Sequence, residues 1–410
     1  MPNKFSNPLK ALKYRNFRLY WFGMMISQTG TWMQNIAQPW LALEVTNNAT
    51  LVGIVAAVQF LPLLVFSLFS GALLDKIDKK LILKITQTGL CLTSLIFALS
   101  VVFGFASYPI ILFLAFLTGL CNCLDSPCRQ SFLYELIDDK GDIPNAVALN
   151  SMSVNIARIM GPFFAGIVMT KFGLAACFFL NSVSFIAIFI SLFFIKHNPS
   201  KTNKRKENIL KSIFSGFHYI KKREILISPL IVVLIVGTFL PNYNVTISSL
   251  SKYSLSGAED TFAYLMAFLG IGSFFGALWV AFTSKNISYK TVKIMPFIAA
   301  TFLIAIGLSR DFTTAGVFLA MTGFSFMICV STINSLLQLN SREDFRGRVM
   351  SVYILFFLGS TPIGAVISGV LASKFGAGMA LVICGFCVYI LLIIWWIIKS
   401  YYLNLKIKFN

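Results

Sequence analysis

Long apolar runs alternate with short polar gaps along the whole chain. Twelve runs can be delimited, at residues 17–43, 51–74, 82–104, 108–130, 146–170, 175–195, 225–250, 258–283, 291–308, 313–338, 347–372 and 378–398. Each is long enough to cross the hydrocarbon core of a bilayer, about 30 Å thick, which takes about 20 helical residues. Only α-helices and closed barrels can span that core, because lipid offers no partners to backbone N–H and C=O groups. The runs lack the alternation of barrel strands, so the pattern predicts an all-α membrane protein with twelve transmembrane helices.

The longest polar stretch, residues 196–224, separates six runs from six. We therefore expect an N-terminal six-helix half (1–195), a basic cytoplasmic linker (196–224) and a C-terminal six-helix half (225–410), with a central cavity between repeated halves. Within the linker, apolar residues recur at helical spacing over 209–220, with lysines on the other face. This spacing predicts an amphipathic helix on the inner membrane surface.

Positive charge is concentrated in alternate gaps. Of 34 Lys and Arg residues, 29 lie at the termini, in the even-numbered gaps or at the ends of the runs that border them, four lie in the odd gaps, and Arg158 lies deep inside a run. The positive-inside rule then places both termini and the even gaps in the cytoplasm, as expected for a multi-pass protein of a bacterial cytoplasmic (inner) membrane. Basic cytoplasmic loops account for the net charge of +19, so nucleic acid is not an expected partner.

The composition argues against soluble and catalytic proteins. Mean hydropathy is +0.80, with 57% hydrophobic and only 12% charged residues, which is far from the composition of soluble domains. The eight cysteines lie in or at the ends of apolar runs and both histidines lie in the central loop, so we expect neither a metal site nor a cofactor. No G-x-x-x-x-G-K-[ST] motif is present, and no nucleophile–base–orienter set can be assembled. The sequence therefore predicts a protein that is not an enzyme and is not driven directly by ATP.

One gap carries a recognisable motif. Gly71-Ala-Leu-Leu-Asp75-Lys76-Ile-Asp78-Lys79-Lys80 resembles the cytoplasmic signature between helices 2 and 3 of the major facilitator superfamily, with Asp78 where the general pattern has glycine. Further stretches resemble the branch containing the enterobactin exporter and macrolide efflux proteins. These are 16–21, 30–34, 125–130, 144–150, 158–162 and 346–351.

The resemblance implies the major facilitator fold, a central cavity and a conformational latch. Gly71 lets neighbouring helices approach closely. Asp75 is expected to face the start of helix 11, where Ser341-Arg-Glu-Asp344 predicts a capping box, and a carboxylate there gains about 0.3–1 kcal/mol from the helix dipole. The full set of latch candidates is Gly71, Asp75, Lys76, Lys79, Lys80, Arg346 and Arg348.

Two charges lie deepest inside apolar runs. Asp125 is in the fourth run and Arg158 in the fifth, and such charges normally face a partner or a wet cavity. Asp125 also has Arg129 one helical turn away. One interpretation is a fixed Asp125–Arg129/Arg158 network that joins helices 4 and 5; the other is a proton site at Asp125. Glu44, at the periplasmic mouth, is a further proton candidate, although a solvated helix-end acid explains it as well.

The first run carries many amides. Gln28, Thr31, Asn35 and Gln38 share one helical face, and pointing them at lipid would be costly. We expect them to line the cavity together with Trp32, Gln59, Asn155, Asn242 and Asn244, with helix 7 breaking at Pro241. An aromatic-rich chain with 41 Phe suits amphipathic or hydrophobic small molecules.

Three functions remain open on the sequence. The first is a secondary active, proton-coupled exporter of small amphipathic or hydrophobic compounds, of the drug-efflux type, working as a monomer in the bilayer by alternating access. The second, with the same fold, is a dedicated exporter of a siderophore or another metabolite, whose catecholate or carboxylate would meet Arg158. The third is a non-transporting membrane receptor or assembly factor.

Overall fold

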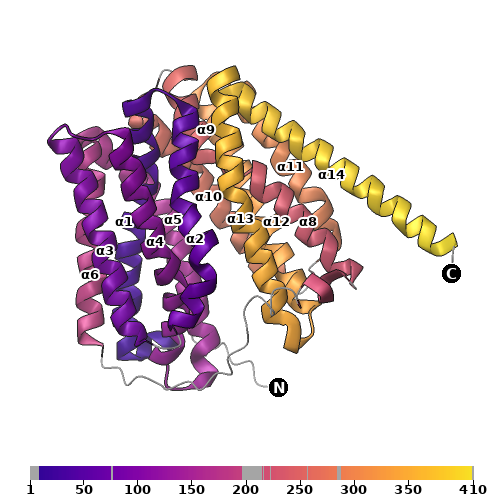
Figure 1. Ribbon diagram of the computed structural model, residues 1–410, viewed down its shortest axis with the longest axis horizontal. Helices are drawn as coiled ribbons and strands as arrows, with labels where there is room; N and C mark the ends of the chain where they lie inside the picture. Colours follow the sequence, from indigo (N-terminus) through magenta and orange to yellow (C-terminus); the bar gives the residue numbers. More distant parts are fainter. Residues whose placement is uncertain are drawn as a thin grey trace. The chain divides into compact units, whose positions relative to one another are not determined.

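The computed structural model describes residues 9–74, 77–195, 215, 217–221, 223–255, 257–283 and 288–408. Within these residues every regular element is a helix (Figure 1). The N-terminal helices are α1 (Arg15–Thr46), α2 (Ala49–Leu74), α3 (Lys79–Val102), α4 (Tyr108–Leu133), α5 (Ile143–Phe172) and α6 (Leu174–Phe194). The C-terminal helices are α8 (Glu224–Phe239), α9 (Tyr243–Ser249), α10 (Glu259–Thr283), α11 (Tyr289–Leu308), α12 (Phe312–Leu339), α13 (Glu343–Phe375) and α14 (Ala377–Lys408).

All twelve predicted runs coincide with helical segments, which confirms the predicted fold class. Eleven helical stretches within the described residues are long and apolar enough to cross a membrane. The remaining segment, α1, falls short by composition because its amides and hydroxyls interrupt an otherwise apolar sequence. Most of the predicted amphipathic linker helix, 209–220, lies outside the described residues.

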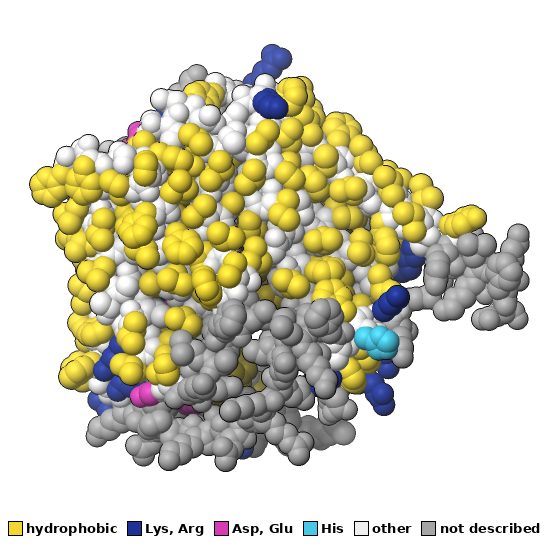
Figure 2. Space-filling view, viewed as in Figure 1, with side chains coloured by type: hydrophobic (Ala, Val, Ile, Leu, Met, Phe, Trp, Pro, Cys, Tyr) yellow, Lys and Arg dark blue, Asp and Glu magenta, His cyan; other side chains and the backbone are white. Residues whose placement is uncertain are grey.

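On the face shown in Figure 2, hydrophobic side chains cover much of the surface of the described helices. Examples are Ile85, Val102, Phe193 and Ile397, each more than 60% exposed. Isolated apolar side chains are common on soluble proteins, whereas a continuous apolar surface is not. A surface of this kind is stable only where lipid or another apolar phase covers it.

The seventh predicted helix (225–250), called helix 7 here, is broken at Pro241, as the sequence predicted. α8 ends at Phe239 and α9 begins at Tyr243, and a π-helical turn, Leu250–Ser254, follows. Pro241 stands in the break and has no N–H to continue the helical ladder. The Asn242 side-chain amide donates to the carbonyl oxygen of Thr238 at 2.7 Å, which satisfies one acceptor freed by the break.

The helices group into two compact units. One comprises residues 1–47 and 58–206, and the other comprises residues 48–57 and 207–410. The start of α2 thus belongs with the second unit, where the Thr50 hydroxyl donates to the Gly369 carbonyl at 3.3 Å and Ser373 donates to Asn48 at 2.9 Å. The sequence did not predict this grouping, because these polar contacts join residues more than 300 positions apart.

Glycines allow helices within each unit to cross closely. In the N-terminal unit, a Cβ atom at Gly119 of α4 would lie 2.0 Å from the Gln59 carbonyl oxygen of α2. In the C-terminal unit, a Cβ at Gly364 of α13 would lie 1.8 Å from the Thr238 carbonyl oxygen of α8. Small residues at such crossings bring backbones into contact, which is how helices associate without a hydrophobic driving force between them.

Candidate functional site

Asp125 is a buried carboxylate on α4. The Thr86 hydroxyl and the Gln87 side-chain amide, both on α3, donate to its Oδ1 at 2.8 and 2.7 Å. Arg129, one turn further along α4, forms an ion pair with its Oδ2. Two neutral donors and one cation therefore surround the carboxylate, and each stabilises its charged form.

The network around Asp125 differs from the expected one. One interpretation was a network of Asp125 with Arg129 and Arg158 that joins helices 4 and 5; the pair with Arg129 is present, whereas two further contacts of the carboxylate come from α3. The reason is the rotation of α4, which turns Asp125 toward α3. The Asp125 contacts thus hold α3 against α4 rather than α4 against α5.

Arg158 of α5 lies beside an aromatic ring of α1. Its guanidinium carbon is 5.2 Å from the centre of the Trp32 ring, within the range of a cation–π interaction. Gly161, three residues further along α5, is what allows this approach, because a Cβ there would lie 2.3 Å from the Trp32 Cβ. Both side chains are half-buried, so the pair presents one cation and one large aromatic surface together.

The amides of α1 divide between two environments. Gln28, Thr31 and Asn35 are half-buried, and Gln38 is buried and donates to the Gln59 side-chain oxygen of α2 at 3.0 Å. The Gln38 and Gln59 amides therefore pair with each other across α1 and α2.

Gln34 accepts hydrogen bonds in the interior of the N-terminal unit. Its side-chain oxygen accepts hydrogen bonds from Ser94 of α3 and Asn181 of α6, at 2.6 and 2.7 Å. Its two partners could not be identified from the sequence, because they lie 60 and 147 residues away.

The other cavity candidates are held by local contacts. Asn155 donates to the Ser151 carbonyl at 3.0 Å within α5, and Asn242 donates within the helix 7 break. Asn244 is half-buried on α9, and Glu44 is exposed near the end of α1. Asn242 and Asn244 belong to the C-terminal unit and the other candidates to the N-terminal unit, so a shared cavity stays a prediction.

Only part of the latch motif lies within the residues that the structure describes. Asp75 and Lys76 lie outside the described residues, and Gly71 lies near the end of α2. Lys79 forms an ion pair with Glu135, and the Lys80 ammonium donates to the Ile195 carbonyl at 2.6 Å, just after α6. These two lysines therefore join the start of α3 to the segments that follow α4 and α6.

Arg346 and Arg348 lie at the start of α13. The Arg346 Nε donates to the Gln338 carbonyl of α12 at 3.1 Å, and the Arg348 guanidinium lies 5.0 Å from the Phe345 ring centre. α13 begins at Glu343 with Arg342 at its N-cap, so Ser341 does not occupy the N-cap position that the predicted capping box at 341–344 requires. The Ser341 hydroxyl instead donates backward to Leu337 at 2.5 Å, so it satisfies the end of α12 rather than the start of α13.

Two clusters at helix ends were missed by sequence reasoning. Asp142, just before α5, accepts from Lys10 and Lys13 at 2.6 and 2.7 Å and from the Tyr14 hydroxyl at 2.9 Å. The hydrogen bond to Asp142 raises the pKa of the Lys13 ammonium. These contacts tie the segment before α1 to the start of α5, and their signal in the sequence is only a set of charges 128 or more residues apart.

The second cluster joins the end of the linker to the turn between α12 and α13. The Tyr219 ring stacks on Phe345 with centres 4.3 Å apart, and its hydroxyl accepts from the Arg342 backbone N–H at 3.1 Å. Arg223 donates to the Asn340 carbonyl at 3.4 Å. The part of the linker that the structure describes therefore contacts the same turn as Arg346.

Comparison with known proteins agrees with this architecture. The family described as transmembrane secretion effector matches residues 6–404. A staphyloferrin A transporter of Staphylococcus aureus is 25% identical over 389 residues, covering 92% of this chain and 94% of that protein. The multidrug efflux pump Tap of Mycolicibacterium fortuitum is 24% identical over 366 residues, covering 87% and 88%.

Solved structures with the same fold are transporters. The nucleoside transporter NupG superimposes with a TM-score of 0.77 at 12% identity, covering 92% of this chain and 97% of that one. A bacterial homolog of the human lysosomal transporter Spinster gives a TM-score of 0.76 at 13% identity, covering 95% and 98%. At such identities the likeness concerns the fold alone.

Proposed function

The chain belongs to the transmembrane secretion effector family of the major facilitator superfamily, and from this premise we propose that it exports small amphipathic compounds in exchange for protons. It is a multi-pass membrane protein and a secondary transporter of a small molecule. The direction of transport, the coupling ion and the substrate class are our proposal. We place it in a bacterial inner membrane, working as a monomer.

We infer proton coupling from the surroundings of Asp125. A buried carboxylate inside a membrane-spanning helix is costly and marks a functional site by default. Its donors come from two helices, α3 and α4, so a shift of one helix against the other changes how well the charged form is stabilised. Such a carboxylate can bind a proton in one state of the transport cycle and release it in another.

The observation that bears on the substrate is the Trp32–Arg158 pair beside the amide face of α1. An indole ring offers apolar area to a hydrophobic body, and half-buried amides offer a few hydrogen bonds, as in many small-molecule sites. This combination suits amphipathic compounds, and the relative Tap is named a multidrug efflux pump.

Arg158 supports a second candidate function. A guanidinium binds carboxylates in a two-pronged geometry, and one relative is named a staphyloferrin A transporter. A dedicated exporter of an anionic siderophore or metabolite would use Arg158 for this contact. The two candidates predict different substrates for the same site.

Transport in inverted membrane vesicles tests the proposal. With an imposed proton gradient, vesicles containing the protein should accumulate either ethidium, a cationic amphipathic dye, or staphyloferrin A, an anionic siderophore. Accumulation of ethidium supports the first function, and accumulation of staphyloferrin A supports the second. Uptake of neither, or uptake that ignores a proton uncoupler, contradicts proton-coupled export of these classes.

The charge asymmetry predicts which side of the membrane each loop faces. A cysteine introduced by Asn203→Cys should react with a membrane-impermeant maleimide only in inverted vesicles, because residue 203 lies in the most basic gap. Arg310→Cys, in an odd-numbered gap, is the matched control and should react in intact cells. Labelling of the Asn203→Cys variant from outside intact cells would rule out cytoplasmic termini.

The latch predicts a specific loss of transport. Asp75→Asn should lower turnover by up to about fivefold at normal protein abundance, because a neutral amide loses the attraction to a helix N-terminus, about 0.3–1 kcal/mol. Asp78→Asn is the matched control in the same gap. Asp78 caps α3 by accepting from the Lys80 backbone N–H at 2.9 Å, and asparagine caps a helix as well as aspartate does. Wild-type turnover in the Asp75→Asn variant would refute the latch.

A further inference from the structure

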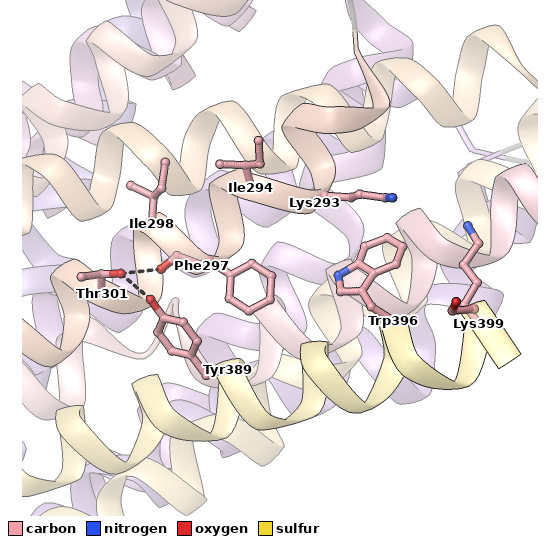
Figure 3. A pocket seen from close by; sticks show the side chains of 9 residues that line it. Lys293, Ile294, Phe297, Ile298, Thr301, Tyr389, Trp396 and Lys399 are labelled. Atoms are coloured by element: carbon pink, nitrogen blue, oxygen red, sulfur yellow. Dashed lines mark hydrogen bonds between the residues drawn. The ribbon is translucent and has the colours of Figure 1, made fainter.

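A groove runs between α11 and α14 in the C-terminal unit (Figure 3). It has a volume of about 630 Å³. One end carries two cations, Lys293 and Lys399, and the rest is bordered by Ile294, Phe297 and Ile298 of α11. A groove with a cationic end and an apolar length matches an amphipathic anion.

The cationic end of the groove has a hydrogen-bond donor available for a ligand. The Lys399 ammonium donates to the Ser228 hydroxyl and to the Tyr289 hydroxyl, both at 2.8 Å, which leaves one of its three N–H donors. The Lys293 and Lys399 nitrogens lie 5.1 and 5.4 Å from the centre of the Trp396 ring. Among the side chains that the structure describes, no carboxylate lies within 4 Å of either nitrogen.

Two like charges that lie near the same ring centre repel each other, and an anion close to both offsets that repulsion. The aromatic ring stabilises each cation only through its quadrupole. The charge on this end of the groove is therefore complementary to a phosphate.

The cationic end of the groove lies where two apolar helices end. Tyr289 is the first residue of α11, and Lys399 lies near the end of the apolar stretch Ala377–Tyr401 of α14. Tyr, Trp and Lys at the ends of spans are typical of the membrane–water interface. From there the groove follows α11 toward Thr301, which hydrogen-bonds the Tyr389 hydroxyl at 2.5 Å. Its apolar length thus points along the span, where acyl chains lie.

We propose that this groove binds one anionic phospholipid, with the phosphate between Lys293 and Lys399 and an acyl chain along Ile294, Phe297 and Ile298. Basic pockets between helices on the cytoplasmic side are suited to such headgroups. The site lies wholly within the C-terminal unit, so the inference is independent of the transported substrate and of the direction of transport. The bound lipid would bridge α11 and α14 on the surface of that unit.

Tryptophan quenching by brominated lipid tests the proposal. The full chain is reconstituted in phosphatidylcholine vesicles with increasing brominated phosphatidylglycerol or, in parallel, brominated phosphatidylcholine. The emission of Trp396 is taken as the difference between the wild type and Trp396→Phe. Since each lysine near the surface favours an anionic lipid by about fivefold, half-quenching should need about 25-fold less brominated phosphatidylglycerol than phosphatidylcholine.

Charge reversal at exposed residues separates the groove from general basicity. Lys293→Glu should reduce the preference for phosphatidylglycerol by fivefold or more. Lys290→Glu, an exposed lysine that does not line the groove, is the matched control and should change the preference by less than twofold. Lys293 is itself exposed, so its replacement is not expected to impair folding. Lys399→Gln provides a second variant on the other side of the phosphate and should also weaken the preference about fivefold.

Three outcomes would overturn the proposal. Equal quenching by the two brominated lipids would show that the groove does not select a charged headgroup. Equal effects of Lys290→Glu and Lys293→Glu would assign the preference to net charge. Relief of phosphatidylglycerol quenching by millimolar soluble glycerol phosphate would identify a soluble anion as the occupant.

Discussion

Asp125→Asn is expected to abolish proton-driven efflux, with a loss of at least a hundredfold in inverted vesicles. Asparagine is close in size and can still accept from Thr86 and Gln87, which contact the carboxylate at 2.8 and 2.7 Å. It cannot bind and release a proton in the physiological range. Binding of substrate, and its downhill exchange without a proton gradient, should persist.

A purely structural role for Asp125 predicts a different set of results. Asp125→Asn leaves the Arg129 guanidinium without its ion-pair partner in a buried setting, and breaking a buried pair costs about 3–5 kcal/mol. Abundance would then fall. The double variant Asp125→Asn with Arg129→Gln removes both charges and should restore abundance under either role.

Proton-driven efflux by the double variant decides between the roles. Stable protein that binds substrate without coupling supports Asp125 as the proton carrier. Recovery of proton-driven efflux would exclude Asp125 as an obligatory carrier. Glu44→Gln serves as the control for the alternative carrier, since Glu44 is exposed near the end of α1, and it should leave coupling intact.

The helices could be predicted because the bilayer fixes their length. Each apolar run had to cross about 30 Å as a helix, and a proline placed the break in helix 7. The packing between helices depends on rotation about each axis, which the composition of a single run does not encode. For this reason the sequence predicted the Asp125–Arg129 pair but not the contacts of Asp125 with Thr86 and Gln87 of α3.

The missed contacts share one property, which is distance along the chain. Asp142 contacts Tyr14 across 128 residues, and Gln34 contacts Asn181 across 147. A polar residue in an apolar run shows that some partner exists, but any polar residue at the same membrane depth could serve. The same uncertainty affects Ser341, whose hydroxyl can satisfy either the helix before it or the helix after it.

Gly161 connects packing to the candidate substrate site. A Cβ at this position would lie 2.3 Å from the Trp32 Cβ and 3.1 Å from the Thr29 carbonyl oxygen. Neither atom is the mobile end of a side chain, so Gly161→Ala must push α5 away from α1. Overpacking of this kind costs about 1–3 kcal/mol, and we expect a loss of that size in the free energy of unfolding.

The same displacement should impair transport. Arg158 lies three residues from Gly161 on α5, and its guanidinium lies 5.2 Å from the Trp32 ring centre, so separation of α5 from α1 alters the surface offered to substrate. We expect the Km for efflux to rise at least fivefold in Gly161→Ala. The matched control for stability is Gly347→Ala, where no described atom lies within 4 Å of the added Cβ and alanine favours the helix by about 0.5–1 kcal/mol. Equal thermal stability of the two variants in detergent, together with a wild-type Km for Gly161→Ala, would show that the contact between α1 and α5 does not shape the substrate site.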